Sequence, residues 1–138
     1  MSTENSTSEY LLLFRGNDWT NALSPAELQE AMTQVRQWFE GLGSRGIMKA
    51  AQPLLNEGRI ISSKSGAVAD GPFVESKEAV GGYLIVKTDT LDEAVAIARQ
   101  CPMLQYGGSV EVRPIAEECP KMKELGLSIQ KELAGATA

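Results

Sequence analysis

The pattern of apolar and polar positions along the chain predicts strands separated by helices. Residues 10–14 (YLLLF) and 83–86 (YLIV) are continuous apolar runs of strand length, a pattern typical of strands buried on both faces. Weaker strand patterns cover residues 47–54 and a short hairpin made of 59–63 and 67–69 around a glycine-containing turn. We expect these weaker strands at an edge of the sheet.

Residues 109–115 (SVEVRPI) alternate between apolar and polar positions. Because side chains of a strand point to opposite faces in turn, Val110 and Val112 share one face and Glu111 and Arg113 share the other. This segment predicts a strand with one charged face.

Residues 25–43 have the spacing of a long amphipathic helix. Ser24 can cap its start, Pro25 suits the first helical position, and Glu27 can complete a capping box. Its apolar positions are Leu28, Ala31, Met32, Val35, Trp38, Phe39 and Leu42. The aromatic pair Trp38 and Phe39 lies on this stripe, so we expect core packing there rather than a ligand site.

Two further helices are predicted in the second half of the chain. One covers residues 91–100, with Thr90 as its cap and Cys101-Pro102 at its end. Its predicted inward positions are Leu91, Ala94, Val95 and Ala98. The other begins at Pro120 and carries an apolar seam of Met122, Leu125, Ile129 and Leu133.

This order of elements is an α+β pattern, for which a split βαβ arrangement is the expected solution. Its two long helices can cover only one face of the sheet. The other face would expose a large apolar patch, and a second copy packing sheet to sheet would cover it. We therefore expect a homodimer. The chain divides into a disordered lead-in (1–8), one α+β domain (9–115), and a C-terminal amphipathic helix and tail (116–138).

Composition narrows the classes of function. The chain has 138 residues, 13 Lys and Arg against 18 Asp and Glu, a net charge of −5, and no histidine. It has no basic cluster to neutralise phosphates, which argues against binding to nucleic acid. No apolar run approaches the roughly 20 residues that span a bilayer, and no signal peptide is evident, so we expect a cytoplasmic protein without a membrane partner.

The two cysteines, Cys101 and Cys119, lack further thiols or imidazoles with which to form a zinc site. We expect two reduced thiols, no metal and no cofactor.

Several ordered motifs together carry a resemblance to a known family. They are Asp70-Gly71-Pro72-Phe73, residues 75–78 (ESKE), Gly81-Gly82-Tyr83, Cys101-Pro102 and residues 110–115 (VEVRPI). Over about residues 9–115 the chain resembles the YCII-related family, in the branch marked by the Asp-Gly-Pro-Phe motif. The resemblance implies a ferredoxin-like fold that dimerises as an α+β barrel, with two sheets enclosing a cleft.

What the resemblance implies about function is less specific. In the broader YCII-like group, a His and Asp pair is regarded as the acid and base of a small-molecule enzyme. Members of the Asp-Gly-Pro-Phe branch often accompany alternative sigma factors and lack an assigned reaction. Asp70 matches the branch motif, but this chain has no histidine to pair with it.

Asp70 is the candidate catalytic residue. It could act as a base or anchor a polar ligand at a cleft where strands end. Alternatively, it accepts backbone N–H bonds in a turn, which Gly71 and Pro72 favour and from which Phe73 reaches the core.

Five further residues are candidate ligand-binding groups. Arg15 and Arg113 end apolar strands and could bind a carboxylate or phosphate, or pair with carboxylates of the protein itself. Tyr83 and Tyr106 could present hydroxyl groups to a cavity, or simply pack. Trp19 follows the first strand, where it could close a cavity mouth or lie at an interface.

Two functions remain open. The first is a homodimeric module without assigned activity that binds a small polar or aromatic molecule in its sheet cleft, with a link to sigma-factor regulation. The second is a small lyase, isomerase or hydrolase that uses Asp70 as base, with Tyr106 or Arg15 stabilising negative charge. A third role, protein binding through the C-terminal seam, is also compatible with the pattern.

Overall fold

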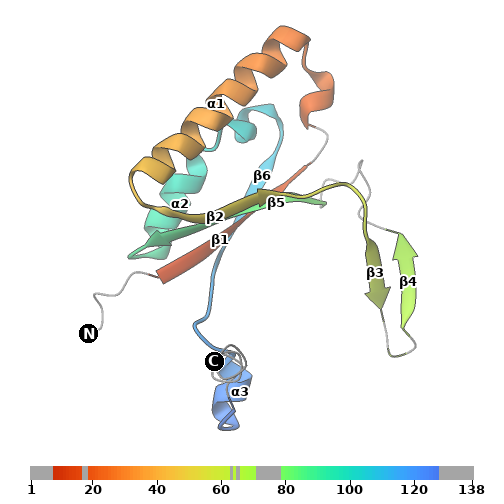
Figure 1. Ribbon diagram of the computed structural model, residues 1–138, viewed down its shortest axis with the longest axis vertical. Coiled ribbons are helices and arrows are strands. Elements are labelled where there is room, and N and C mark those ends of the chain that lie inside the picture. The colour runs from red at the N-terminus through yellow and green to blue at the C-terminus, as the bar shows by residue number, and fades with distance from the viewer. Residues whose placement is uncertain (1–7, 17–18, 63, 65, 71–78, 128–138) are drawn as a thin grey trace, which may run out of the picture.

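The computed structural model describes residues 8–16, 19–62, 64, 66–70 and 79–127 (Figure 1). The elements in chain order are β1 (Ser8–Arg15), the short 3-10 helix η1 (Trp19–Ala22), α1 (Pro25–Ser44), β2 (Met48–Pro53), β3 (Arg59–Ser62), β4 (Ala67–Asp70), β5 (Val80–Thr88), α2 (Leu91–Arg99), the 3-10 helix η2 (Pro102–Tyr106), β6 (Ser109–Pro114) and α3 (Pro120–Glu124).

The main sheet has four antiparallel strands in the order β2-β5-β1-β6. β5 lies between β1 and β2, and β1 lies between β5 and β6, so each of the two helical connections returns to a strand that is not its neighbour. This is the split βαβ arrangement that the sequence predicts. The chain has a ferredoxin-like α+β fold.

Both long helices cover the same face of this sheet (Figure 1). On β1 the alternate residues Tyr10, Leu12 and Phe14 are buried, as are Leu84 and Val86 on β5. They pack with Leu42 of α1 and with Ala94, Ile97 and Ala98 of α2. Burial of these side chains is the main stabilising contribution to the domain.

Local sequence explains where the helices begin. The Ser24 hydroxyl accepts a hydrogen bond from the Glu27 N–H at 3.2 Å, and the Glu27 carboxylate accepts one from the Ser24 N–H at 2.8 Å. Hydrogen bonding from the Ser24 backbone N–H, and then from the Ser24 side chain, lowers the pKa of the Glu27 carboxyl. Thr90 and Glu93 form the same capping box at α2, so both predicted helix starts are confirmed.

One predicted inward residue of α2 is wrong. Leu91 is 43% exposed, whereas Ile97, which the prediction omitted, is buried. Leu91 is the first residue of the helix and is exposed there, while Ile97 lies two residues before its end on the same face as Ala94.

The hairpin also differs from the prediction. β3 and β4 pair with each other, but they form a separate two-stranded sheet instead of an edge of the main one. Figure 1 shows the hairpin to one side of the main sheet. Its apolar residues are consequently exposed, Ile61 by 71% and Val68 by 61%.

The C-terminal seam is interrupted within the described residues. α3 ends at Glu124, and Gly126 has a φ of 76°, a left-handed conformation that ends helices. Leu125 therefore does not continue a helical stripe from Met122, which corrects the prediction. Ile129 and Leu133 lie outside the described residues, as do residues 1–7 of the predicted lead-in. The division into three parts stays a prediction.

The face of the sheet opposite the helices carries a second set of apolar side chains. Leu11 and Leu13 of β1 lie beside Ile85 and Tyr83 of β5 in the strand register, and all four are partly exposed. We call these four residues the open-face patch. Within the part of the chain that the structure describes, no helix is long and apolar enough to cross a membrane.

Candidate functional site

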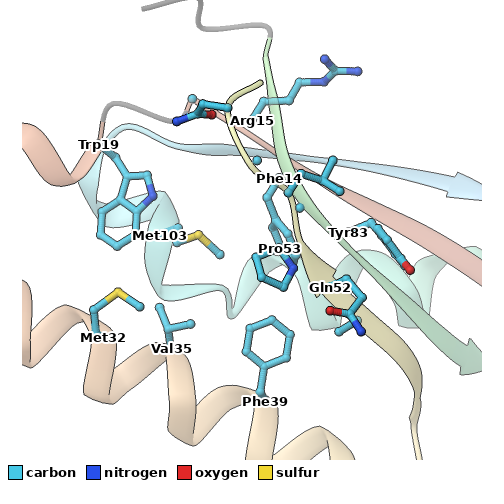
Figure 2. Close-up of a pocket in the computed structure, with 16 residues that line it drawn as sticks. Phe14, Arg15, Trp19, Met32, Val35, Phe39, Gln52, Pro53, Tyr83 and Met103 are labelled. Atoms are coloured by element: carbon cyan, nitrogen blue, oxygen red, sulfur yellow. The ribbon is translucent and has the colours of Figure 1, made fainter. Parts of the chain in front are cut away.

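A pocket of about 490 Å³ lies where α1 passes the end of the main sheet (Figure 2). It is formed where β1 ends, where β5 begins and where β2 runs out toward the hairpin. The described residues that line it are Phe14, Arg15, Gly16, Trp19, Met32, Val35, Phe39, Ala51, Gln52, Pro53, Leu54, Asn56, Gly81, Gly82, Tyr83 and Met103. Its size is typical of pockets that hold small organic molecules.

The inner walls of the pocket are apolar. Met32, Val35 and Phe39 recur on one face of α1 and point toward the sheet, while Met103 of η2 lies between them and β1 (Figure 2). The apolar stripe of α1 thus continues past the last residues of the sheet that could cover it. The pocket is the space that remains there.

Trp19 closes one side of the pocket, and the ring of Tyr106 supports the face of the indole that lies away from the cavity. Its ring stacks on that of Tyr106, with the centroids 5.5 Å apart and the planes inclined by 24°. Trp19 belongs to η1 and Tyr106 to η2, so the stack joins the loop after β1 to the loop before β6. Two candidates from the sequence are therefore in contact, but only Trp19 lines the cavity.

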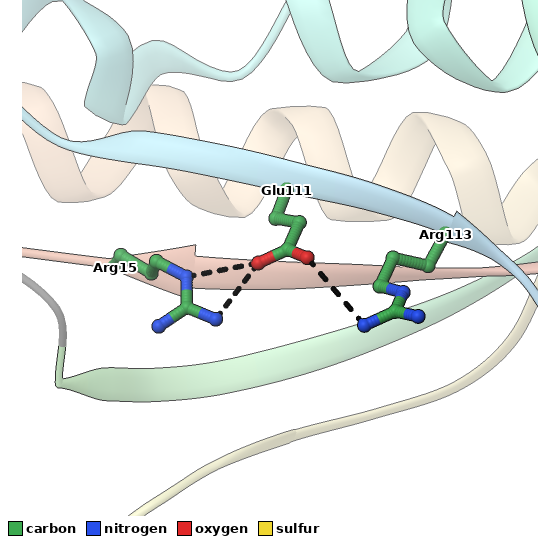
Figure 3. A network of polar contacts seen from close by, with 3 residues as sticks. All are labelled: Arg15, Glu111 and Arg113. Atoms are coloured by element: carbon green, nitrogen blue, oxygen red, sulfur yellow. Dashed lines mark hydrogen bonds and ion pairs between the residues drawn. The ribbon is translucent and has the colours of Figure 1, made fainter.

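Arg15 and Arg113 are joined through a carboxylate that the sequence prediction did not single out (Figure 3). The Nε and Nη2 atoms of Arg15 donate to Oε1 of Glu111 at 3.1 and 2.7 Å, and Nη1 of Arg113 lies 3.8 Å from Oε2. Of the two alternatives for these arginines, pairing within the protein is the one observed.

The ion pairs turn the Arg15 head group away from the cavity. In Figure 2 its guanidinium extends away from Trp19 and Phe14, and Figure 3 shows it reaching Glu111 across the sheet. Arg15 thus contributes its backbone and aliphatic stem to the pocket rim. Tyr83 lies across Pro53 from Trp19, with its hydroxyl directed away from the indole (Figure 2).

Gly82 permits the close approach of β2 and β5 at the rim. A Cβ at this position would lie 3.0 Å from the Gln52 carbonyl oxygen and 3.2 Å from the Pro53 Cα. Next to it, the Leu54 N–H donates a hydrogen bond to the Gly81 carbonyl at 2.9 Å. This bond joins the chain just after β2 to the start of β5, and the β3-β4 hairpin lies between these two positions in the sequence. The Gly81-Gly82 pair therefore lies inside β5, where it shapes the rim, because β5 begins at Val80, three residues before the predicted run of residues 83–86.

Asp70 is the last residue of β4 and pairs in register with Arg59. The Gly71, Pro72 and Phe73 positions that define the predicted turn lie outside the described residues. A catalytic role for Asp70 stays a prediction.

Cys101, a buried free cysteine, precedes η2, the helix that carries Met103 of the pocket wall. Burial raises the pKa of this thiol, so it is protonated and unreactive at neutral pH. No group of three or more His, Cys, Asp or Glu side chains in the described ranges is arranged to hold a metal ion. The arrangement that the structure does present is a pocket with largely apolar walls.

Sequence reasoning located Trp19, Arg15 and Tyr83 but missed the residues that make the cavity. Met32, Val35 and Phe39 were interpreted as core because they lie on the apolar stripe of α1. A signal that could have found them is length, since the stripe of α1 is longer than the apolar run of the strand it covers. For Met103 and Glu111, no comparable feature of the sequence indicates a place at the pocket or beside Arg15.

Two comparisons bear on what this chain is. It is 44% identical over 50 residues to an uncharacterized protein of Rhizobium meliloti; the match covers 36% of this chain and 40% of that relative, so the chain spans about two fifths of the relative's length. The family model of the YCII-related domain matches residues 10–119, from β1 to the residue before α3. The chain therefore belongs to the YCII-related family.

Proposed function

We propose that this protein is a homodimeric YCII-type module that binds a small polar or aromatic molecule in the pocket between α1 and the end of the sheet. The observation that carries the proposal is the pocket itself, whose inner wall is made of aromatic and methionine side chains next to a polar rim. Such a combination of apolar walls and few polar groups is typical of small-molecule sites.

The open-face patch supports the dimer. Leu11, Leu13, Tyr83 and Ile85 form a continuous apolar surface on the side of the sheet that the two long helices leave uncovered. Contiguous apolar surface of this kind marks interaction sites on small domains. A second copy placed face to face would cover it on both protomers at once, as a two-fold axis requires.

Charged residues surround this patch in the pattern of an interface rim. Arg15, Glu111 and Arg113 lie at one side of it, and Glu9 pairs with Lys49 at 2.6 Å at the other. Because these charges are already paired within the chain, association would bury no uncompensated charge.

Sedimentation of a charged patch variant tests the dimer. Leu11→Glu places a carboxylate in the centre of the patch, where it can stay hydrated only in the monomer. We expect the wild-type protein to sediment as a dimer at micromolar concentration and Leu11→Glu as a folded monomer. Val68→Glu, a change of the same kind on the exposed hairpin, is the control and should stay dimeric. A monomeric wild type would overturn this part of the proposal.

Thermal-shift screening of metabolites tests the binding role. A ligand that binds only the folded form raises the melting temperature, and the rise grows with the logarithm of the ratio of its concentration to its Kd. Any hit should lose its effect in Trp19→Ala, which opens the wall of the pocket, and keep it in Val68→Ala. A hit that acts equally on Trp19→Ala would show that it binds elsewhere.

The family resemblance extends the proposal to a regulatory role beside an alternative sigma factor. It is supported by the Asp70-to-Phe73 motif of the branch. Promoter-specific transcription in vitro, with and without this protein and its ligand, would test it; unchanged transcript levels under both conditions would count against it.

A further inference from the structure

We infer that the pocket selects an uncharged molecule with an aromatic ring system and rejects anions of the same shape. This inference rests on the proposed binding role and specifies the class of ligand. It follows from the chemistry of the wall, from the state of the one charged side chain among its described residues, and from the way the wall is supported.

The part of the described wall made by α1, Phe14, Trp19 and Met103 offers apolar and aromatic surface. Phe14 and Phe39 meet edge to face with ring centroids 6.3 Å apart, and the indole of Trp19 lies on the opposite side (Figure 2). Aromatic rings pack favourably against both edges and faces of other rings. Met32 and Met103 complete the wall with polarizable thioethers, which adapt to the outline of a ring and contact it favourably.

Arg15 is the single Lys, Arg, Asp or Glu among the described residues that line the pocket. Its guanidinium already binds the Glu111 carboxylate through two hydrogen bonds, of 2.7 and 3.1 Å, and points away from the cavity (Figure 2). A carboxylate or sulfonate entering the pocket would lose its hydration without gaining this partner, unless the Glu111 pair were broken. Burying an anion without a partner costs far more than its apolar contacts return.

The Trp19 wall is fixed before a ligand arrives. Its stack with Tyr106 holds the indole from the far side, so one face of the ring is already occupied and the pocket side remains for the ligand. A wall that is ordered in advance reduces the entropy lost on binding a flat ring.

A matched pair of dyes tests the inference on the full-length protein. N-phenylnaphthylamine is uncharged, and anilinonaphthalene sulfonate has the same ring system with a sulfonate added; both fluoresce when they enter an apolar site. We expect the uncharged dye to bind at least about tenfold more tightly at neutral pH.

Two tryptophan variants locate the dye. Met32→Trp fills the pocket from α1, and we expect it to weaken binding of the uncharged dye by at least about tenfold. Leu91→Trp adds the same side chain at a comparably exposed position of α2, outside the pocket, and should leave binding unchanged.

The outcomes separate the inference from the proposed function. If both dyes bind with equal affinity, or the sulfonate binds more tightly, and Met32→Trp abolishes both, the pocket is a binding site but the selection for uncharged ligands is wrong. If neither dye binds, or if Met32→Trp binds the uncharged dye as the wild type does, the pocket is not the site and the proposed function fails with the inference.

Discussion

Trp19 and Tyr106 stack with ring centroids 5.5 Å apart, and through this contact the loop after β1 supports a pocket wall from the loop before β6. The two rings differ in their position relative to the pocket. Trp19 faces the cavity, whereas Tyr106 contacts Trp19 from behind and does not line the pocket. Substitutions at the two positions should therefore have different consequences.

Tyr106→Ala should lower the free energy of unfolding by about 0.5–1.5 kcal/mol, the value of an aromatic pair, and weaken binding of N-phenylnaphthylamine by less than about threefold. Trp19→Ala removes both the stack and the wall, so we expect a larger loss of stability, about 1–3 kcal/mol, and a loss of dye affinity of about tenfold. Urea unfolding and dye titration measure both quantities. Equal effects on dye affinity would show that Trp19 acts only through the stack.

The ion pair between Arg15 and Glu111 should contribute modestly to stability. Their side chains are 29% and 38% exposed, so solvent screens the attraction, and a double-mutant cycle with Arg15→Gln and Glu111→Gln should give a coupling of about 0.5–1 kcal/mol. The cycle of Arg113 with Glu111 is the comparison. Arg113 is 68% exposed and its distance is 3.8 Å, so its coupling should be smaller and should vanish first as salt is added. The reverse order would contradict the geometry.

Gly82→Ala should destabilise the domain although it adds only a methyl group. The new Cβ would press against backbone atoms of Gln52 and Pro53, which can yield only if β2 moves away from β5. We expect a loss of about 1–3 kcal/mol in urea unfolding, together with weaker dye binding, since the rim of the pocket would shift. Gly41→Ala in α1 is the matched control. No atom lies within 4 Å of its added Cβ, so it should stabilise the helix by about 0.5–1 kcal/mol.

Cys101 should make stability depend on alkaline pH. Burial holds the pKa of its thiol above the ordinary value in the folded protein, so the unfolded chain loses this proton at a lower pH than the folded one does. The contribution is complete below the unfolded pKa of about 8.5 and declines as the pH rises from there through the folded pKa.

Urea unfolding of the wild type and of Cys101→Ala, measured from neutral to alkaline pH, should therefore show a steeper decline for the wild type. Cys119→Ala, at a partly exposed thiol, should follow the wild-type profile. Parallel profiles for all three proteins would show that the Cys101 thiol titrates alike in the folded and unfolded states.

The elements that the sequence predicted well are those set by interactions close along the chain. Ser24, Pro25 and Glu27 define the start of α1 within a single turn, and the Ser24 capping box and the Thr90 cap of α2 formed as expected. The runs at 10–14 and 83–86 became the two inner strands of the sheet, where each pairs with a strand at both edges and buries its alternate residues under the helices.

Several of the errors and omissions involve positions whose neighbours are distant in sequence. Leu91 has the helical spacing of a core residue, but it is the first residue of α2 and its side chain is exposed there. β3 and β4 have strand patterns, yet nothing local shows that their hairpin stands apart from the main sheet. Glu111 was assigned to a charged face, and only the register of β1 with β6 brings it to Arg15.

The sequence by itself determined the elements, the split βαβ order and the apolar character of the inner strands, because short-range periodicity and capping encode all three. The tertiary structure alone decided that α1 runs beyond the sheet and leaves a pocket, that Trp19 stacks on Tyr106, and that the Arg15 guanidinium pairs with the Glu111 carboxylate. These relationships depend on strand register and on the angle at which a helix crosses a sheet, which arise only when distant segments pack together.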